Sequence, residues 1–279
     1  MVTSAGQCAQ IACIWEAIAN KPGNVSRLHD FVDLTYVDLL LSAAAIAPEM
    51  EKAAGRRVGE TILASIRATR QVVRTNTNLG IVLLIAPLAA VPVGEPLRHG
   101  LERFLDRLDV ADARFAYEAV RLAEPGGMGR VKEQDVSDEP TRPLREVMAL
   151  AAERDLVARQ YDNGFGEVFD IGLPSLQKAL RSAHDLESVI IHAFLSLLAE
   201  CPDSLIARKC GLGEAEEVTR RARSVLGGGD LAEFDCWLRA DGHRRNPGTT
   251  ADLTAASLFV ALREGIIELP PQLPWAAGA

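Results

Sequence analysis

Three polar turns contain the residue types that could bind a phosphate-bearing ligand together with a divalent cation. The first covers residues 21–33 and reads KPGNVSRLHDFVD. Lys21 and Arg27 supply positive charge suited to phosphate, and a glycine between them lets a ligand approach the backbone. Asp30 and Asp33 would share one side of a helical turn, where they could bind a hard cation such as magnesium. The alternative is that these acids only favour a helix start electrostatically.

The second polar turn, residues 74–80, reads RTNTNLG and precedes the most apolar helix expected in the chain. Its amide and hydroxyl side chains, including Asn76 and Asn78, would lie beside unbonded backbone N–H groups at a helix start. Such an arrangement suits ribose hydroxyls or phosphate oxygens. The alternative is a helix cap with no ligand.

The third polar turn, residues 243–252, reads HRRNPGTTAD and also opens an apolar helix. Arg245 adds charge, and Thr249 and Thr250 add hydroxyl groups. Asp252 falls in the first helical turn, where it could bind a cation or only complement the helix dipole. The sequence thus repeats the arrangement of the second turn.

Other polar residues have simpler interpretations. Asp155 and Arg159 are four residues apart and are expected to pair across a helix face, although Asp155 could instead serve as a base or metal ligand that Arg159 orients. His184 and His192 are expected to be ordinary surface and core histidines and not ligands. The sequence contains no Walker A, GxGxxG, GxSxG or HExxH motif. It therefore does not indicate the common phosphate-binding, dinucleotide-binding, acyl-transfer or zinc-protease sites.

The elements that must position these turns are predicted to be helices. Ala and Leu dominate the apolar residues, and the alternation typical of strands is almost absent, so an all-α fold is expected. Ile81–Ile85 could pass for a buried strand, but helix is favoured because no partner strand is available. The expected helices are Gln7–Ala19, Thr35–Ala54, Gly59–Arg74, Asn78–Ala90, Glu95–Leu108, Asp109–Ala123, Leu144–Ala158, Ser175–Ala199, Glu214–Leu226, Leu231–Ala240 and Thr249–Glu264.

A few residues should mark helix boundaries. Pro48 is expected to kink or end its helix, Asp109 and Thr249 or Thr250 to cap helix starts, and Gly265 to close the last helix in a left-handed conformation. The segment Glu124–Pro143, rich in Gly, Pro and acids, is expected to be a long surface loop. We expect a single domain, residues 1–279, formed by a multi-helix bundle whose polar loops converge on a central cleft.

Composition limits the class of protein. The chain has 279 residues, of which 48% are hydrophobic, and this composition indicates a globular protein. Its net charge of −8 argues against sequence-independent binding of nucleic acid through an overall positive surface. Its five cysteines lack CxxC spacing, so neither a zinc ribbon nor a disulfide framework is indicated. No secretory signal and no membrane-spanning segment are recognised, and a cytoplasmic location is expected. The oligomeric state stays open.

The three turns together resemble the triphosphoribosyl-dephospho-CoA synthase family. The similarity rests on Lys21-Pro-Gly-Asn24, Thr75-Asn-Thr-Asn-Leu-Gly80 and Asn246-Pro-Gly-Thr-Thr-Ala-Asp-Leu253, in the family's order and at similar separations. The resemblance implies an all-helical, magnesium-dependent transferase that joins the triphosphoribosyl group of ATP to dephospho-CoA and releases adenine. The product would be the precursor of a lyase prosthetic group.

The resemblance also implies roles for residues of the three turns. Asp30, Asp33 and Asp252 are the candidates for proton transfer and for magnesium. The nucleotide-binding candidates are Lys21, Asn24, Arg27, Asn76, Asn78, Arg245, Thr249 and Thr250.

The chain departs from the family pattern at two places. Asn246-Pro-Gly-Thr-Thr-Ala-Asp252 stands where the family tends to have Ser-Pro-Gly-Gly-Ser-Ala-Asp, and Asp203-Ser204 leads to Arg208-Lys209-Cys210-Gly211 where the family tends to have Asp-Thr-Asn followed by His and paired Gly. These differences remove amide and imidazole groups that could contact one substrate. They therefore bear on the identity of the acceptor more than on the use of ATP. Two alternatives therefore remain: phosphoryl or ribosyl transfer to another acceptor in pterin-type cofactor synthesis, or a non-catalytic nucleotide-binding module.

Overall fold

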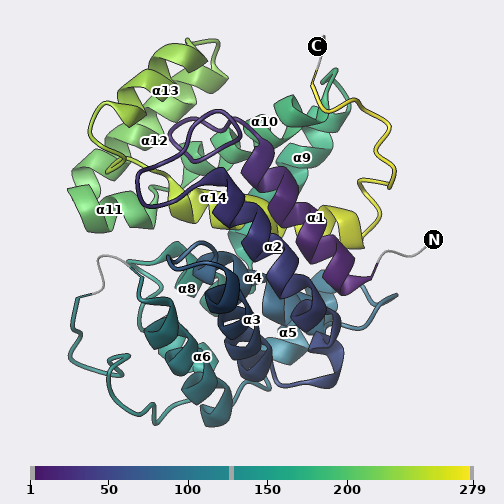
Figure 1. Ribbon diagram of the computed structural model, residues 1–279, viewed down its shortest axis with the longest axis vertical. Helices are drawn as coiled ribbons and strands as arrows, with labels where there is room; N and C mark the ends of the chain where they lie inside the picture. Colours follow the sequence, from purple (N-terminus) through teal and green to yellow (C-terminus); the bar gives the residue numbers. More distant parts are fainter. Residues whose placement is uncertain (1–3, 126–128, 277–279) are drawn as a thin grey trace. The chain divides into compact units, whose positions relative to one another are not determined.

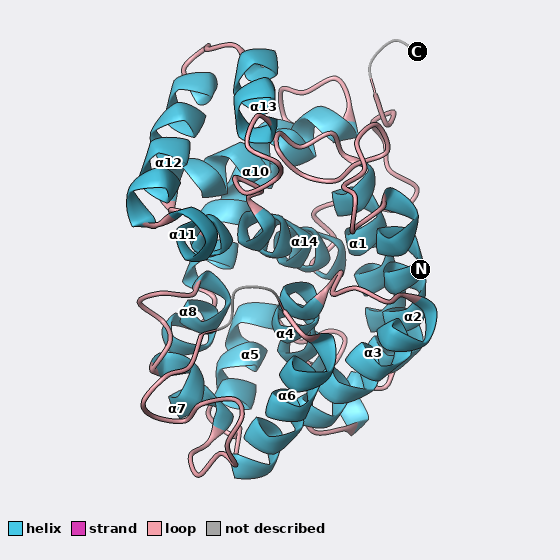
Figure 2. Cartoon of the chain, turned by 60° about the vertical axis from the view of Figure 1, so that its left-hand side comes forward, coloured by secondary structure: helices cyan, strands magenta, loops and turns pink. Residues whose placement is uncertain are grey.

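The computed structural model describes residues 4–125 and 129–276, and these residues form helices joined by loops without a strand (Figure 2). The all-α prediction is therefore confirmed. The chain forms two compact units. Unit 1 contains residues 4–14 and 37–165, and unit 2 contains residues 15–36 and 166–276. The expectation of one domain stays a prediction.

Unit 1 is built around α4 (Leu79–Ala90), which is buried over almost its whole length. Leu, Ile, Val and Ala occupy all its faces, as expected for a helix surrounded by other helices. It packs against α3 (Val58–Val72), α5 (Leu97–Leu105), α6 (Val110–Ala123) and α8 (Leu156–Asn163). The remaining elements are α7 (Leu144–Ala149), the short 3₁₀ helix Ala53–Gly55, the first part of α1 (Ala5–Ile18) and nearly all of α2 (Tyr36–Glu51).

α3 and α6 pack closely, side by side in Figure 1, because a glycine lies at their contact. A Cβ atom on Gly59 would lie 2.5 Å from the carbonyl oxygen of Asp112. The side chain of Asp112 accepts a hydrogen bond from Gly59 N at 2.9 Å and another from Asp109 N at 3.1 Å. Asp109 in turn caps α6 by accepting from Ala111 N and Asp112 N, which confirms its predicted role.

Unit 2 is built around α10 (Leu186–Glu200) and α14 (Gly248–Arg263), which contact each other. α10 also packs on α9 (Leu173–Leu180) and α12 (Leu212–Leu226), and α14 packs on α9, α11 (Ser204–Cys210) and the π-helical turn Val168–Gly172. α13 (Leu231–Arg239) lies against α12. The core here includes Phe194, Leu198, Ile206, Val218 and Phe234.

Two predicted helices are each divided in the structure, and the reason is a capping aspartate. Leu144–Ala158 consists of α7 and part of α8, because Asp155 accepts from Val157 N and Ala158 N and starts a new helix. Ser175–Ala199 consists of α9 and α10, because Asp185 accepts from Ser188 N. The sequence analysis also missed α11, which Asp203 caps in the same way.

Other boundary predictions had mixed outcomes. Ile81–Ile85 is helical as expected, and Gly265 has a left-handed φ of +68° at the end of α14. α2 passes Pro48 and ends at Glu51. The threonine cap of α14 was wrong: the helix begins after Pro247 with no side-chain cap, because Thr249 and Thr250 make other contacts.

The segment Glu124–Pro143 includes residues 126–128, which lie outside the described residues; its described part is a loop. Asp135 orders it by accepting hydrogen bonds from Val131 N at 2.7 Å and from Ser137 N at 3.0 Å. No helix in the described ranges is by itself long and apolar enough to cross a membrane, although the bent pair α10 and α11 reaches the necessary length and hydropathy when taken together.

Candidate functional site

Lys21 is fully buried at the end of α1, in unit 2. Its ammonium forms an ion pair with Glu16 Oε1 at 2.9 Å and donates to the backbone oxygens of Glu16 and Ala19. A lysine that bonds the last carbonyl groups of a helix satisfies acceptors that have no partner within the helix. In this structure Lys21 therefore holds the start of the first turn against the C-terminal end of α1. Its contact with a nucleotide stays a prediction.

The first and third polar turns meet inside unit 2. Asn24 Nδ2 donates to Asn246 Oδ1, and Gly23 N donates to Asp235 Oδ1 at 2.7 Å. Gly23 has a φ of +75°, and a Cβ atom there would lie 2.9 Å from Leu238 and 3.1 Å from Pro247. Only glycine therefore fits this turn without displacing a neighbour.

Asn24 is almost completely buried, and its Oδ1 atom has no hydrogen-bond partner among the described residues. Arg239 helps to hold this segment, since its Nη2 donates to Asn24 O at 2.9 Å while its Nε pairs with Asp235. An unpartnered buried amide oxygen is costly unless a ligand or water donates to it. Asn24 is thus suited to accept a hydrogen bond from a hydroxyl or amine of a ligand.

Thr249 and Thr250 are buried and form hydrogen bonds with residues at the start of α11. Asp203 Oδ2 accepts from Thr250 N at 2.7 Å and from Thr250 Oγ1 at 2.8 Å, and Ser204 Oγ donates to Thr249 Oγ1 at 3.0 Å. The other oxygen of Asp203 caps α11. Burial raises the pKa of Asp203, and its hydrogen bonds oppose that shift.

The sequence analysis assigned no role to Asp203 in this region. Its signal was an Asp directly before a short apolar helix, which is the pattern of a helix N-cap. The contact with Thr250 joins residues 47 positions apart and has no local signature.

The three carboxylates predicted to bind magnesium all belong to unit 2. Asp30 and Asp33 are exposed in the second half of the first turn, and Asp30 Oδ1 accepts from Tyr36 N at 2.6 Å. Asp252 is partly buried in α14 and lies beyond its first turn, so the expected first-turn position was wrong. Among residues 4–125 and 129–276, no group of three or more His, Cys, Asp or Glu side chains is arranged to hold a metal ion. Metal binding by these acids stays a prediction.

The two arginine candidates are also in unit 2, and each is paired with a glutamate. Arg27 Nη2 lies 3.1 Å from Glu187 Oε2, and 40% of its side chain is exposed. Arg245 is more enclosed: it pairs with Glu214, donates to Trp237 O at 3.2 Å, and stacks over the Trp237 ring. Arg27 is therefore the more accessible cation.

The second polar turn lies in unit 1, where it starts α4. Asn76 Oδ1 accepts from Leu79 N at 3.2 Å and so bonds the first backbone N–H of α4, whose N-cap residue is Asn78. Asn78 is buried, and its Nδ2 donates to Thr69 Oγ1 at 3.1 Å. Its Oδ1, like that of Asn24, has no hydrogen-bond partner within the described part of the chain. Convergence of this turn with the other two stays a prediction.

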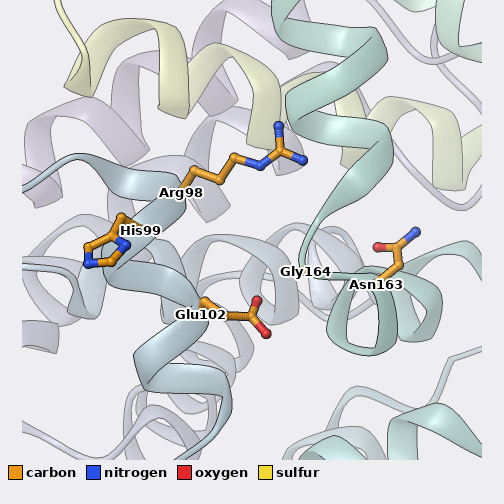
Figure 3. A pocket seen from close by; sticks show the side chains of 5 residues that line it. All are labelled: Arg98, His99, Glu102, Asn163 and Gly164. Carbon is orange, nitrogen blue, oxygen red and sulfur yellow. The ribbon is translucent and has the colours of Figure 1, made fainter.

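A separate cavity of about 440 Å³ lies in unit 1 between α5 and the end of α8 (Figure 3). Arg98, His99 and Glu102 line it from α5, Asn163 from the end of α8, and Gly164 from the position directly after that helix. Glu102 is held by an ion pair with Arg145 at 2.8 Å. This cavity contains none of the predicted site residues.

Comparison with protein families identifies a match to the model for ATP:dephospho-CoA triphosphoribosyl transferase over residues 2–269. The chain belongs to this family. The resemblance seen in the three polar turns is thereby confirmed, and the family is one of transferases that use ATP.

Individual relatives are distant. A protein of Stutzerimonas stutzeri (strain A1501) is 32% identical over 108 residues, and one of Pseudomonas savastanoi pv. phaseolicola (strain 1448A / Race 6) is 24% identical over 165 residues. Both carry the name "Probable 2-(5''-triphosphoribosyl)-3'-dephosphocoenzyme-A synthase". These matches cover 36% and 53% of this chain, and 37% and 53% of the relatives. The chain thus spans about half or less of the length of these relatives.

A solved crystal structure from Archaeoglobus fulgidus, named for triphosphoribosyl-dephospho-coA synthase, is similar over a larger part of the chain. The TM-score is 0.65 and the sequence identity is 30%. The similarity covers 81% of this chain and 99% of the other. The helical architecture is therefore shared with a structure of the same family.

Proposed function

We propose that this chain transfers the triphosphoribosyl group of ATP to a ribose hydroxyl of dephospho-CoA and releases adenine, giving the precursor of a lyase prosthetic group. The observation that supports this most strongly is the family match over residues 2–269. The contact between the Lys21–Asn24 and Asn246–Thr250 turns agrees with it, because two of the three family-like motifs meet through the Asn24–Asn246 hydrogen bond.

In this reaction the bond from the ribose C1′ to adenine breaks while the acceptor hydroxyl oxygen bonds to C1′. The centre passes through an oxocarbenium-like state, so the protein must hold the triphosphate, take the hydroxyl proton and assist the leaving base. We assign proton transfer to Asp30 or Asp33, which are exposed, with Asp252 as the third candidate. Arg27 is the accessible cation for phosphate. The buried oxygens of Asn24 and Asn78 suit donor groups of the nucleotide.

Magnesium is proposed to arrive with the triphosphate as part of the substrate. Magnesium bound to a nucleotide needs only one or two protein carboxylates and keeps phosphate and water oxygens as its other ligands. This requirement is compatible with the described residues, which offer no cluster of three or more ligands. The ion would neutralise phosphate charge.

The deciding experiment is incubation of the protein with ATP, dephospho-CoA and magnesium. We expect free adenine, detected by chromatography, in an amount equal to the coupled product. Formation of ADP would select phosphoryl transfer instead. Unchanged ATP without adenine would count against the proposed reaction.

Asn76→Asp tests whether the second turn contacts the triphosphate. The aspartate keeps an oxygen that can accept from Leu79 N, so this hydrogen bond is retained, but it adds a negative charge. We expect a rise in the KM for ATP of about tenfold, which corresponds to roughly 1.4 kcal/mol. Gln71→Glu makes the same charge change at an exposed position of α3 and should leave KM nearly unchanged. Equal KM values in the two variants would remove Asn76 from the site.

A further inference from the structure

His243, at the start of the third turn, has an unusual backbone. Its φ is +66°, and it follows Gly242 with a φ of +55°. A positive φ is energetically unfavourable for a residue with a Cβ atom. Such a residue keeps this conformation only where contacts with its surroundings stabilise it. What enforces it here is a contact made by the imidazole ring.

The ring of His243 stacks on the ring of Phe31, with the centroids 3.8 Å apart and the planes inclined by 25°. Phe31 is 7% exposed, whereas Asp30, Val32 and Asp33 around it are exposed. Phe31 therefore anchors the acidic loop, defined as residues 27–35, to the third turn, in addition to the ion pair of Arg27 with Glu187.

The acidic loop is folded around Phe31. Phe31 N donates to Leu34 O at 2.8 Å, and Tyr36 N donates to Asp30 Oδ1 at 2.6 Å. These bonds connect Phe31 and Asp30 to the residues that follow them in the loop. A shift of Phe31 would therefore also move the carboxylates of Asp30 and Asp33. Burial and the positive charges of Arg239 and Lys209 lower the pKa of His243, and the negative charge of Asp33 opposes this shift.

On its other side, His243 is connected to the third turn. His243 O accepts from Asn246 N at 3.2 Å, and Asn246 in turn bonds Asn24 of the first turn. One residue thus links the acidic loop to the place where the two polar turns meet.

We propose that His243 is a positioning residue, which holds Asp30 and Asp33 beside the third turn by stacking on Phe31. The inference rests on the proposed function in so far as Asp30 and Asp33 serve that reaction. The stacking partner must be planar and aromatic, but it need not exchange a proton.

His243→Gly and His243→Phe separate this role from a general effect on folding. Glycine adopts a positive φ without strain, so His243→Gly should keep the melting temperature while losing the stack. We expect amide hydrogen exchange at Phe31 and Tyr36 to be at least tenfold faster, and kcat/KM for adenine release to fall by about tenfold. Phenylalanine keeps an aromatic ring at equal backbone strain, so His243→Phe should retain wild-type exchange and most of the activity.

Phe31→Leu removes the same contact from the other side. Because the two residues act through one contact, the double variant with His243→Gly should be no worse than either single variant. Wild-type exchange rates in His243→Gly would overturn the proposal, and so would full activity in that variant despite faster exchange. If the wild type releases no adenine, the proposed reaction fails, while the exchange rates still decide whether His243 anchors the loop.

Discussion

Asp203 is a single carboxylate that bonds the starts of two helices. One oxygen accepts from Leu205 N at 2.8 Å and Ile206 N at 3.1 Å, and the other accepts from Thr250. Asp203→Asn would place an amide NH2 group opposite the backbone N–H of Thr250, which can only donate. Because the site is fully buried, we expect the free energy of unfolding in urea to fall by about 2–4 kcal/mol.

Asp230→Asn is a matched control for this substitution. Asp230 caps α13 with the same geometry, accepting from Ala232 N at 2.8 Å and from Glu233 N at 3.1 Å, but it is exposed. Asparagine is about as good an N-cap as aspartate, so the change in unfolding free energy should stay below about 0.5 kcal/mol. Equal losses in the two variants would mean that burial and the contact with Thr250 do not matter.

The residue types of the candidate site could be predicted from the sequence, but their partners could not. The polar turns were found because Gly, Pro, Asn and charged residues interrupt apolar helices. The burial of Lys21 against Glu16 and the stacking of Arg245 on Trp237 depend on how helices end and pack. A charged side chain in a turn looks the same in the sequence whether it meets a ligand or a neighbouring carboxylate.

Helix packing in unit 1 depends on the missing side chain of Gly59. Its Cβ would come within 2.6 Å of Asp112 Cα, and backbone atoms of a packed helix cannot move aside cheaply. Gly59→Ala should therefore lower the unfolding free energy by about 1–3 kcal/mol. Gly213 is also the second residue of its helix, α12, but a Cβ there would meet no described atom within 4 Å.

Gly213→Ala should consequently stabilise the protein by about 0.5–1 kcal/mol, since alanine has the higher helix propensity. The two substitutions are chemically identical and differ in their surroundings. Urea unfolding should show changes of opposite sign. A stabilising Gly59→Ala would mean that α3 and α6 are not packed as described.

At the level of elements, the sequence predicted most helices because their apolar periodicity is long and clear. It failed where short helices follow each other, as at α7 and α8 or α9 and α10. There the apolar pattern continues through the break, and only a capping Asp marks the new start. Hydrophobic periodicity alone therefore merges neighbouring helices.

At the scale of the whole molecule, two of the three boundaries between the two units fall inside helices. The boundary after Ile14 divides α1, and the one after Tyr36 lies in α2. A helix forms cooperatively, so neither unit should unfold without disturbing these shared helices. We expect one unfolding transition.

Tryptophan fluorescence makes this expectation measurable, because Trp15, Trp237 and Trp275 all belong to unit 2. Circular dichroism at 222 nm reports helices of both units. The two signals should give the same urea midpoint if the units unfold together. Distinct midpoints would show that the units unfold independently.

The chain has five lysines, and four of them, Lys52, Lys132, Lys178 and Lys209, are exposed, whereas Lys21 is fully enclosed with its ion-pair partner. Among the lysines of the folded protein, amine-reactive dyes, crosslinkers and sensor surfaces will consequently attach to these four and not to Lys21. Immobilisation through these groups leaves the Lys21–Asn24 turn chemically intact, which makes amine coupling a suitable route to ligand-binding measurements on this protein.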